Sequence, residues 1–380
     1  MIDRLTDEQR DFVAAVNNFC QREIGDRERR GKLTDGGKNP HSAELYEKMA
    51  DLGWLGITVP EQYGGAGQAM VDLVLFLEST AYWQAPIYAF VTSAIAAASY
   101  EKFAAEEQKR RVLADFLRGK VLAVSMSEPG AGSDVGALAC KAEQRDGGWV
   151  VNGQKTWCSN AHIAEHILLV ARTSTAGGKH DGLTMFSVPA GVDGLTVQGI
   201  DTMGGREVND LYFTDCFLPG DAVVGEVGQG WKQLMAGLNL ERMILAANML
   251  GTARRAFDDT VAYVRERHQF GRPVGSFQSL QHRLADVFID LEHVKSLAAA
   301  TLDPGEQQRS HWLVPMAKVA ADRLAVSSAN SALQVHGGLG FTWELPVHHY
   351  LKEALRRRTV PQPTAVYRGQ LREQALSYKL

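Results

Sequence analysis

Two adjacent charged residues, Glu241 and Arg242, interrupt an otherwise uncharged and mostly apolar stretch from Gln233 to Ala253. The apolar spacing is helical, and adjacent residues of a helix point about 100° apart, so the two charges cannot neutralise each other on one face. A carboxylate on a buried face either has a cationic partner or acquires a raised pKa, which suits a general base. Two interpretations of Glu241 therefore stay open: a general base, or a structural ion pair with an arginine elsewhere in the fold.

A glycine-rich segment, residues 125–136, follows a short apolar run that ends at Val124. Glycines let the backbone approach a ligand closely, and free N–H and hydroxyl groups bind phosphate or ring oxygens. The spacing is G-x-G-x-x-x-G, and residues 141–160 read as strand, turn and strand, whereas a dinucleotide fold requires G-x-G-x-x-G and then a helix. The segment predicts a cofactor-binding loop in a β-rich region, with an ordinary tight loop as the alternative.

Four separated motifs resemble the signatures of the acyl-CoA dehydrogenases. They are SEPGAGSD at 127–134, NGQKTWCSN at 152–160, RHQFG at 267–271 and QVHGGLGF at 334–341. Their joint occurrence in this order is far more specific than any one of them. The resemblance implies FAD as cofactor, an acyl-CoA as substrate and a helix–β–helix architecture.

The resemblance also implies which residues contact the flavin. Met126 and Ser127 match positions that hold its pyrimidine edge, Trp157 matches the indole beside the isoalloxazine, and Ser159 matches the hydroxyl that bonds N5. Residues that match adenine and pyrophosphate contacts, several of them made across a subunit interface, are Arg267, Phe270, Gln278, Gln334 and Gly338. Taken singly, packing remains the alternative for the two aromatic residues, and a solvated charge for the arginine.

Two further residues match substrate-binding positions of the family. Ser133 corresponds to a serine near the flavin pyrophosphate and the pantetheine arm, and Arg242 corresponds to a residue near the CoA arm. Structural pairing is the alternative for Arg242. No metal-binding residue is implied.

The position of the catalytic glutamate separates two branches of the family. Most members carry it near the C-terminus in a Y-E-G-T-like motif, where this chain has TVPQPT at 359–364, and no acid lies between Glu353 and Glu373. A minority branch, which includes isovaleryl-CoA and long-chain enzymes, carries it in L-x-L-E-R on the first helix of the C-terminal bundle. Residues 238–242 match that pattern, so the resemblance implies that Glu241 is the base.

The chemistry also requires polarisation of the thioester carbonyl. In the family, a flavin ribityl hydroxyl and a backbone N–H beside the usual glutamate do this. Pro361 falls near that position and has no N–H, which leaves Val360 or Gln362 as the backbone donor.

Periodicity predicts the elements that must position these residues. Helical patterns begin at Thr6 and recur at 42–52 and 72–117, where small residues at 93–99 either leave room beside a ligand or pack helices closely. Short β-branched runs fill 121–230, and long amphipathic segments cover 231–268, 276–302, 306–336 and 346–357. We expect a mainly α fold with a small central antiparallel β domain. Its three parts are an N-terminal helical domain (1–120), a β domain (121–230) and a four-helix bundle (231–380).

Composition excludes several classes of function. A net charge of −4 gives no reason to expect nucleic acid or an anionic membrane as a partner, and no apolar run reaches the roughly 18 residues of a membrane span. Four scattered cysteines without a C-x-x-C pair and an acidic N-terminus predict a cytoplasmic protein without a targeting segment. HIAEH at 162–166 fits a zinc-peptidase pattern only on a helix, whereas a loop and strand are expected there.

The leading hypothesis is an FAD-dependent acyl-CoA dehydrogenase that forms a trans-2-enoyl-CoA, with an electron-transferring flavoprotein as oxidant. Flavin contacts across a subunit interface imply at least a dimer, and the family is usually tetrameric. One alternative is a catalytically weak structural partner in a mixed assembly. Another is a flavin oxidase or monooxygenase on the same scaffold.

Overall fold

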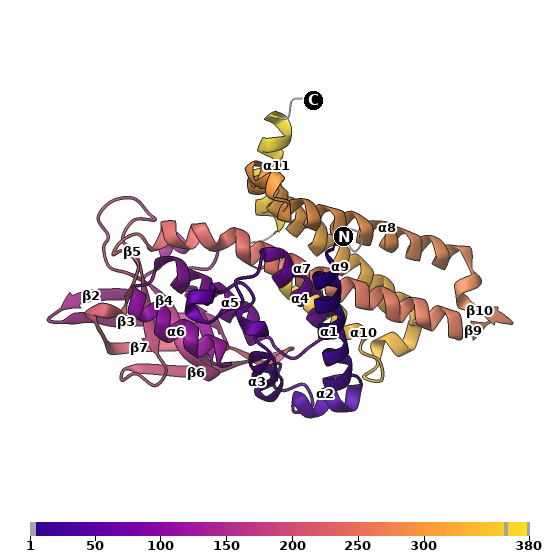
Figure 1. Cartoon of the computed structure of the whole chain (residues 1–380), viewed down its shortest axis with the longest axis horizontal. Helices are drawn as coiled ribbons and strands as arrows, with labels where there is room; N and C mark the ends of the chain where they lie inside the picture. Colours follow the sequence, from indigo (N-terminus) through magenta and orange to yellow (C-terminus); the bar gives the residue numbers. More distant parts are fainter. Residues whose placement is uncertain (1–4, 361–363, 378–380) are drawn as a thin grey trace. The chain divides into compact units, whose positions relative to one another are not determined.

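The computed structural model describes residues 5–360 and 364–377 (Figure 1). The chain forms two compact units, each assembled from separate segments. The bundle unit consists of Met1–Gly25, Met70–Ala85 and Asn239–Leu380, and the sheet unit consists of Asp26–Ala69 and Pro86–Leu238. These units group residues by contact rather than by order along the chain, so the expected division at 120 and 230 stays a prediction.

The sheet unit contains one large twisted sheet. Its strands lie in the order β6-β7-β3-β2-β4-β5-β8, and β1 pairs in parallel with β4 while most other neighbours are antiparallel. The strands are β1 (Val121–Ser125), β2 (Lys141–Arg145), β3 (Gly148–Ser159), β4 (Ala164–Arg172), β5 (Leu183–Pro189), β6 (Leu195–Thr202), β7 (Gly205–Pro219) and β8 (Val223–Val224). The prediction of a β region in the middle of the chain is confirmed.

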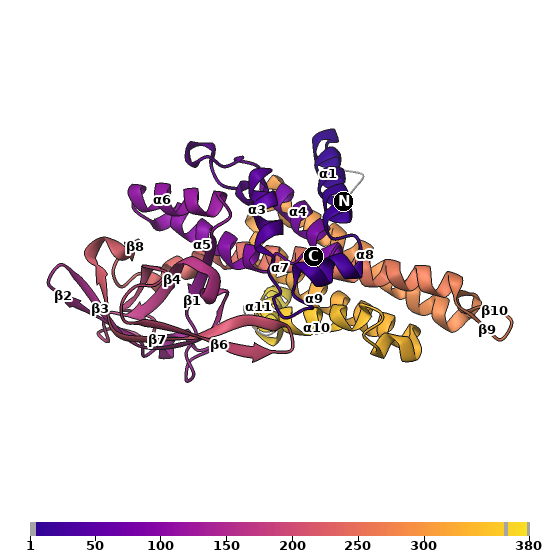
Figure 2. The ribbon, with the colours of Figure 1, turned by 90° about the horizontal axis from the view of Figure 1, so that it is seen from below.

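Helices α2 (Arg27–Leu33), α3 (Ala43–Asp51), α5 (Ala89–Phe103) and α6 (Glu106–Leu117) belong to the same unit. Helix α5 packs on the sheet, as Figure 2 shows from below. The Ser93 hydroxyl bonds both the N–H and the carbonyl of Leu122, and the Tyr100 hydroxyl bonds Ser187 on β5 at 2.8 Å. Ser93 therefore holds α5 on the sheet, and the two interpretations of the small-residue stretch at 93–99 stay open.

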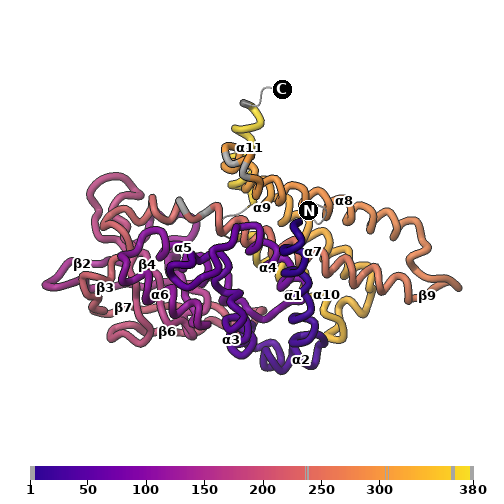
Figure 3. Tube along the Cα trace, in the orientation of Figure 1, coloured from indigo at the N-terminus to yellow at the C-terminus, as the bar shows by residue number. Residues whose placement is uncertain are grey.

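The remaining α-helices lie in the bundle unit. They are α1 (Asp7–Glu23), α4 (Met70–Tyr82), α7 (Gly230–Glu266), which begins in the sheet unit, α8 (Gln278–Leu302), α9 (Ser310–Val335), α10 (Val347–Arg357) and α11 (Thr364–Ser377). Figure 3 follows the chain through the turn between α7 and α8, which holds the short strands β9 (His268–Gln269) and β10 (Arg272–Pro273). In the described part of the chain no helix has the length and apolar character needed to cross a membrane.

The core of the bundle unit explains why the amphipathic segments predicted after residue 231 fold together. Small and branched residues of α7, α8, α9 and α10 bury one another, including Leu250, Leu291, Leu324 and Ala354. Helix α1 begins at Asp7, and the expected Thr6 is its N-cap residue and forms a capping box with Gln9. Helix α11 was not predicted, because residues 364–377 have no clear apolar stripe.

Helices α4 and α7 approach each other so closely that only glycine fits at position 251. A Cβ there would lie 2.2 Å from the backbone carbonyl oxygen of Glu78. Beside this contact, the Glu78 carboxylate pairs with Arg254 at 2.7 Å, and the arginine lies over the ring of Tyr82. An ion pair and a close backbone approach thus fix α4 on α7.

We predict that Gly251→Ala lowers the free energy of unfolding by about 1–3 kcal/mol, the usual cost of overpacking, because backbone must move to admit the methyl group. Urea denaturation followed by circular dichroism measures the change. Gly369→Ala in α11 is the control, since a Cβ there meets no atom within 4 Å and alanine favours a helix. Equal losses in the two variants would contradict the prediction.

Candidate active site

A buried ion pair fixes the loop that follows β1. The Lys155 amine, whose side chain is 0% exposed, donates to Glu128 Oε1 at 2.7 Å and to the Met126 carbonyl at 2.9 Å. The same carboxylate accepts the backbone N–H groups of Ala139 at 2.7 Å and Cys140 at 2.9 Å. Both buried charges are compensated, as burial requires, and the Met126 carbonyl is held in place.

Trp157 projects from β3 beside this loop. The pairing of β3 with β7 is irregular between Lys155 and Cys158, and Trp157 has a φ of 58°, in the left-handed region. Its side chain is 60% exposed, while the N–H of the preceding Thr156 donates to the Ser127 carbonyl at 2.8 Å. The Trp157 ring is therefore exposed at this irregularity, while the bond from the Thr156 N–H holds the neighbouring backbone against the loop.

The remaining predicted residues of the sheet unit lie in this loop and on β3. Ser133 is exposed in the glycine-rich turn, and Ser159 is half-buried at the end of β3. A Cβ at Gly130 or Gly132 would meet no atom within 4 Å, so internal packing does not require either glycine. An open glycine turn, a fixed backbone and an uncovered indole fit the flat ring and phosphates of a flavin nucleotide.

The other predicted cofactor contacts gather at one end of the bundle unit. Arg267 follows α7, Phe270 is the tip of the β9–β10 turn and Gln278 begins α8, while Gln334 and Gly338 lie at the end of α9 and just beyond it. The rings of Tyr263 and His336 stack at 4.3 Å, which joins these two groups. All five predicted residues are exposed, and Phe270 is 91% exposed with a φ of 53°.

Glu241 is half-buried on α7. Burial raises its pKa from 4.5 to about 7, although the positive charges of Arg242 and Lys318 oppose the shift. Among the residues that the structure describes, none forms a hydrogen bond or ion pair with its carboxylate. A partly desolvated carboxylate that titrates near neutrality can take up and release a proton.

Arg242 is buried beneath α11. Its guanidinium lies 4.9 Å from the ring centre of Tyr367 and donates to Asn239 at 3.0 Å. Its Nε atom has no hydrogen-bond partner among the described residues. Arg242 also lines an open cavity of about 440 Å³ together with Asn239, His311, Trp312, Pro315, Gln370, Leu371, Glu373 and Gln374.

A second buried ion pair, Lys318–Asp322 on α9, was missed at the sequence level. The signal was the one that identified Glu241, namely charges in an otherwise apolar helix, here between Leu313 and Ala329. Because the two residues are four apart, they can neutralise each other on one helix face, so the sequence pattern indicates no partner elsewhere in the fold.

The segment that carries the glutamate in most members of the resembled family is only partly described. The N–H of Val360 donates to the Arg357 carbonyl at 3.3 Å, so one of the two expected backbone donors is already engaged. Pro361 and Gln362 lie outside the described residues.

The H-x-x-E-H pattern does not form a metal site. His162 lies in a short 3-10 turn, residues 161–163, and His166 lies on β4, where its ring bonds Asp115 at 2.9 Å. No group of residues in the described ranges has the composition and spacing to hold a metal ion.

Family profiles cover nearly the whole chain. The N-terminal, middle and C-terminal domain profiles of the acyl-CoA dehydrogenases match residues 6–120, 123–216 and 228–375.

Individual relatives agree with these profiles. Isovaleryl-CoA dehydrogenase of Oryza sativa is 35% identical over 357 residues, which cover 92% of this chain and 86% of that protein. A 3-(aryl)acrylate reductase of Clostridium sporogenes is 33% identical, covering 82% of this chain and 84% of that protein. The structure of butyryl-CoA dehydrogenase from Megasphaera elsdenii superposes with a TM-score of 0.90 at 27% identity over 99% of both chains. The chain belongs to the acyl-CoA dehydrogenase family and is a flavin-dependent oxidoreductase with FAD as its cofactor.

Proposed function

We propose that the protein oxidises an acyl-CoA thioester to a trans-2-enoyl-CoA, with Glu241 as the base that removes the α-proton. The observation that carries this assignment is a half-buried carboxylate whose pKa burial raises to about 7. A base with a pKa near the working pH is both ionised and strong enough to accept a proton. When bound, FAD supplies the acceptor for the hydride that leaves the β-carbon with its electron pair.

We further infer how the chain holds FAD and substrate. In the sheet unit, Met126, Ser127, Trp157 and Ser159 hold the ring system, and Ser133 lies near the pyrophosphate and the pantetheine arm. Arg242, in the bundle unit, contacts the CoA arm. The exposed end of the bundle unit binds the adenine half across a subunit interface through Arg267, Phe270, Gln278, Gln334 and Gly338. Support for these roles comes from motif matches and from the openness of the sites.

The partners and location follow from the same proposal. We infer a homo-oligomer of at least two subunits and an electron-transferring flavoprotein as the oxidant, since flavin contacts are shared between subunits in the resembled family. Cytoplasmic location stays a prediction from the cysteines and the N-terminal residues, and the rice relative is named as a mitochondrial protein.

Anaerobic addition of acyl-CoAs to the purified holoprotein tests the reaction. The panel begins with isovaleryl-CoA, because of the rice relative's name. Bleaching of the flavin by one or a few thioesters supports the proposal. Bound flavin that no thioester bleaches would contradict the proposal. If oxygen is then admitted, rapid re-oxidation of the reduced flavin with formation of peroxide would favour an oxidase. If flavin is absent until a second subunit is added, the structural-partner alternative is supported.

A second candidate is the reductive direction of the same half-reaction. The Clostridium relative, at 33% identity, is named as an acrylate reductase. Re-oxidation of chemically reduced protein by an enoyl-CoA, without bleaching of the oxidised protein by any saturated thioester, would favour this direction.

We predict that Glu241→Gln retains FAD and still binds acyl-CoA but loses bleaching by at least about 100-fold, the lower range for a removed general base. Stopped-flow absorbance under anaerobic conditions measures the rate. In the wild type, that rate should rise with pH and level off above about 7, because the base must be ionised. Glu292→Gln, which removes a half-exposed carboxylate on α8, is the control. An undiminished rate in Glu241→Gln would exclude this residue as the base.

The raised pKa of Glu241 also predicts a dependence of stability on pH. Since the folded chain binds this proton more tightly than the unfolded chain, the contribution of Glu241 to stability is full below 4.5 and is lost as pH rises through about 7. Glutamine does not titrate, so Glu241→Gln should gain thermal stability relative to wild type on going from about pH 5 to about pH 8. Differential scanning fluorimetry measures both midpoints, and an equal difference at both pH values would contradict the prediction.

We predict that Glu128→Gln loses FAD during gel filtration, because Lys155 is left as an uncompensated buried charge and its hold on Met126 is disturbed. Breaking one partner of a buried pair costs about 3–5 kcal/mol, which a lower unfolding midpoint would report. The control is Glu143→Gln, which breaks an exposed pair with Arg145 worth at most about 1 kcal/mol. Wild-type FAD content and stability in Glu128→Gln would refute this account.

A further inference from the structure

The guanidinium of Arg172 joins two loops of the sheet unit. Arg172 is the last residue of β4, and its side chain donates to backbone carbonyl oxygens in both loops. Two of these acceptors, Leu138 at 2.8 Å from Nε and Gly136 at 2.9 Å from Nη2, lie in the loop between β1 and β2 (residues 126–140). Because the guanidinium is a rigid fork of donors, the two bonds fix the end of this loop against β4.

The other acceptors of Arg172 belong to the hairpin that connects β4 to β5 (residues 173–182). Its Nη1 atom donates to the carbonyls of Asp181 at 3.0 Å and Ser174 at 3.4 Å. Its Nη2 atom also donates to the Lys179 carbonyl at 3.4 Å. One side chain therefore bonds the backbone of the hairpin and the backbone of the loop at the same time.

The hairpin and the loop also touch each other directly. The Lys179 amine pairs with Asp134 Oδ2 at 2.6 Å, and both side chains are more than half exposed. A Cβ at Gly136 would lie 2.6 Å from Lys179 Cγ and 2.9 Å from His180 Cε1, so the hairpin packs on bare backbone of the loop. Since an exposed ion pair contributes little, the bonds of Arg172 are the main link between the two segments.

The loop between β1 and β2 thus has two anchors. Lys155 holds its first part, through the Met126 carbonyl and the Glu128 carboxylate. Arg172 holds its last part. Ser133 is exposed between the anchors and lies three residues before an acceptor of Arg172, so the second anchor is the nearer one along the chain.

We propose that Arg172 is a positioning residue for substrate binding: by holding the end of the loop on the β4–β5 hairpin, it sets where Ser133 lies. The inference rests on the proposed function, in which Ser133 lies near the flavin pyrophosphate and the pantetheine arm. Arg172 acts through the loop and does not touch the substrate. Arginine suits this role because its planar fork reaches several acceptors at once, whereas lysine has one compact head group.

The two anchors should affect different ligands. Glu128→Gln disturbs the part of the loop that holds the flavin ring, and FAD is expected to be lost. Arg172→Met leaves that part and the adenine contacts in place, so FAD should stay bound. Misplacement of Ser133 should weaken binding of the CoA arm by about threefold to tenfold, the worth of one hydrogen bond.

The test uses the full-chain holoprotein, with free coenzyme A as the probe. Isothermal titration calorimetry measures its dissociation constant and requires no turnover. We expect a threefold to tenfold rise in Arg172→Met and a smaller rise in Arg172→Lys, which keeps the charge and is the variant expected to fold if the methionine is not tolerated. The control is Arg145→Met, which removes an exposed arginine of the same sheet that pairs with Glu143 at 3.0 Å.

Two further readouts separate positioning from general destabilisation. In anaerobic stopped-flow traces, the half-saturating concentration of the thioester that bleaches the wild type should rise by the same factor in Arg172→Met, while the limiting rate stays unchanged. Hydrogen exchange followed by mass spectrometry should quicken together in peptides from 130–140 and 173–182. Both readouts should stay at wild-type values in Arg145→Met.

The outcomes distinguish this inference from the proposed function. Wild-type affinity for coenzyme A in Arg172→Met, or an equal loss in Arg145→Met, would overturn the role of Arg172, as would unchanged hydrogen exchange in the two segments. Loss of FAD together with the affinity would mean that Arg172 only stabilises the loop as a whole, which also overturns the inference. If no thioester bleaches the wild-type flavin, the proposed reaction fails, whereas the calorimetry and the hydrogen exchange still decide on Arg172.

Discussion

Burial of charge is the constraint on which both units of this protein depend. Lys155 and Lys318 are each fully buried, and each donates at under 3 Å to a carboxylate that is nearly as buried. Such groups are fixed, because losing either partner strands a charge in a low dielectric. Glu241 differs, since its carboxylate has nearby positive charges but no direct bond to a described residue. It is therefore the member of the set that remains free to exchange a proton near neutrality.

The sequence indicated which charged residues are buried better than it indicated which groups lie near them. Glu241 could be identified from the sequence because burial of an unpaired carboxylate in an apolar helix raises its pKa. Lys318 and Asp322 are also charged residues in an apolar helix. Because residues four apart can pair on one helix face, the sequence gives no reason to expect further contacts. Which helix face meets α7 is decided by tertiary packing of small residues such as Ala321 and Ala325, and this packing is not legible in a single sequence. The sequence also did not predict that Tyr367 lies against Arg242, because α11 has no apolar stripe that would identify it as a packed helix.

The conformations of the predicted cofactor residues were also beyond the sequence. Trp157 and Phe270 were identified by motif alone, but both have left-handed backbones and strongly exposed rings. Such a backbone costs a non-glycine residue about 1–3 kcal/mol, and an exposed aromatic ring forgoes its burial. The left-handed backbone of Phe270 belongs to the two-residue β9–β10 turn, and its ring contacts Phe277 edge-on at 6.0 Å. The rings of Trp157 and Phe270 nevertheless stay strongly exposed, and a flat ligand laid against each would bury that area. The register of β3 against β7 and the tight β9–β10 turn create these positions, and both arise from pairing rather than from composition.

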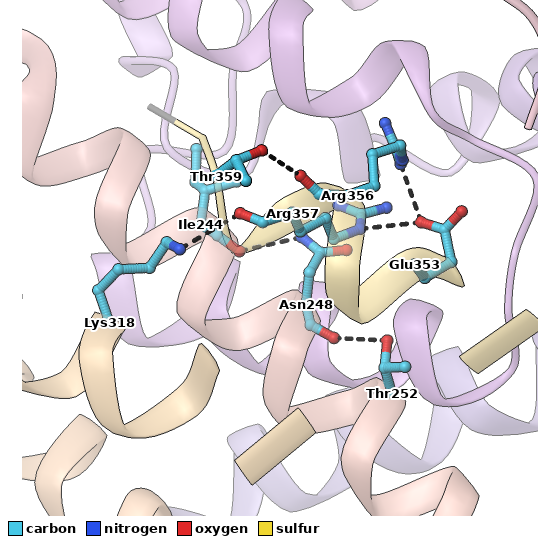
Figure 4. Close-up of polar contacts among 8 residues, drawn as sticks. All are labelled: Ile244, Asn248, Thr252, Lys318, Glu353, Arg356, Arg357 and Thr359. Carbon is cyan, nitrogen blue, oxygen red and sulfur yellow. Dashed lines mark hydrogen bonds and ion pairs between the residues drawn. The ribbon is translucent and has the colours of Figure 1, made fainter. Parts of the chain in front are cut away.

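With the base proposed on α7, the connection between α10 and α11 need not supply a carboxylate. That connection carries no acid, and the N–H of Val360 is bonded to the Arg357 carbonyl. Its ends are nevertheless held by one buried ion pair, through the Arg357 carbonyl and the Thr364 hydroxyl. The pair therefore fixes where α10 ends (Figure 4) and where α11 begins, and α11 in turn lies over Arg242 through Tyr367. Because Lys318 and Asp322 neutralise each other inside the fold, removing either partner alone would leave a buried charge uncompensated and loosen both helix ends.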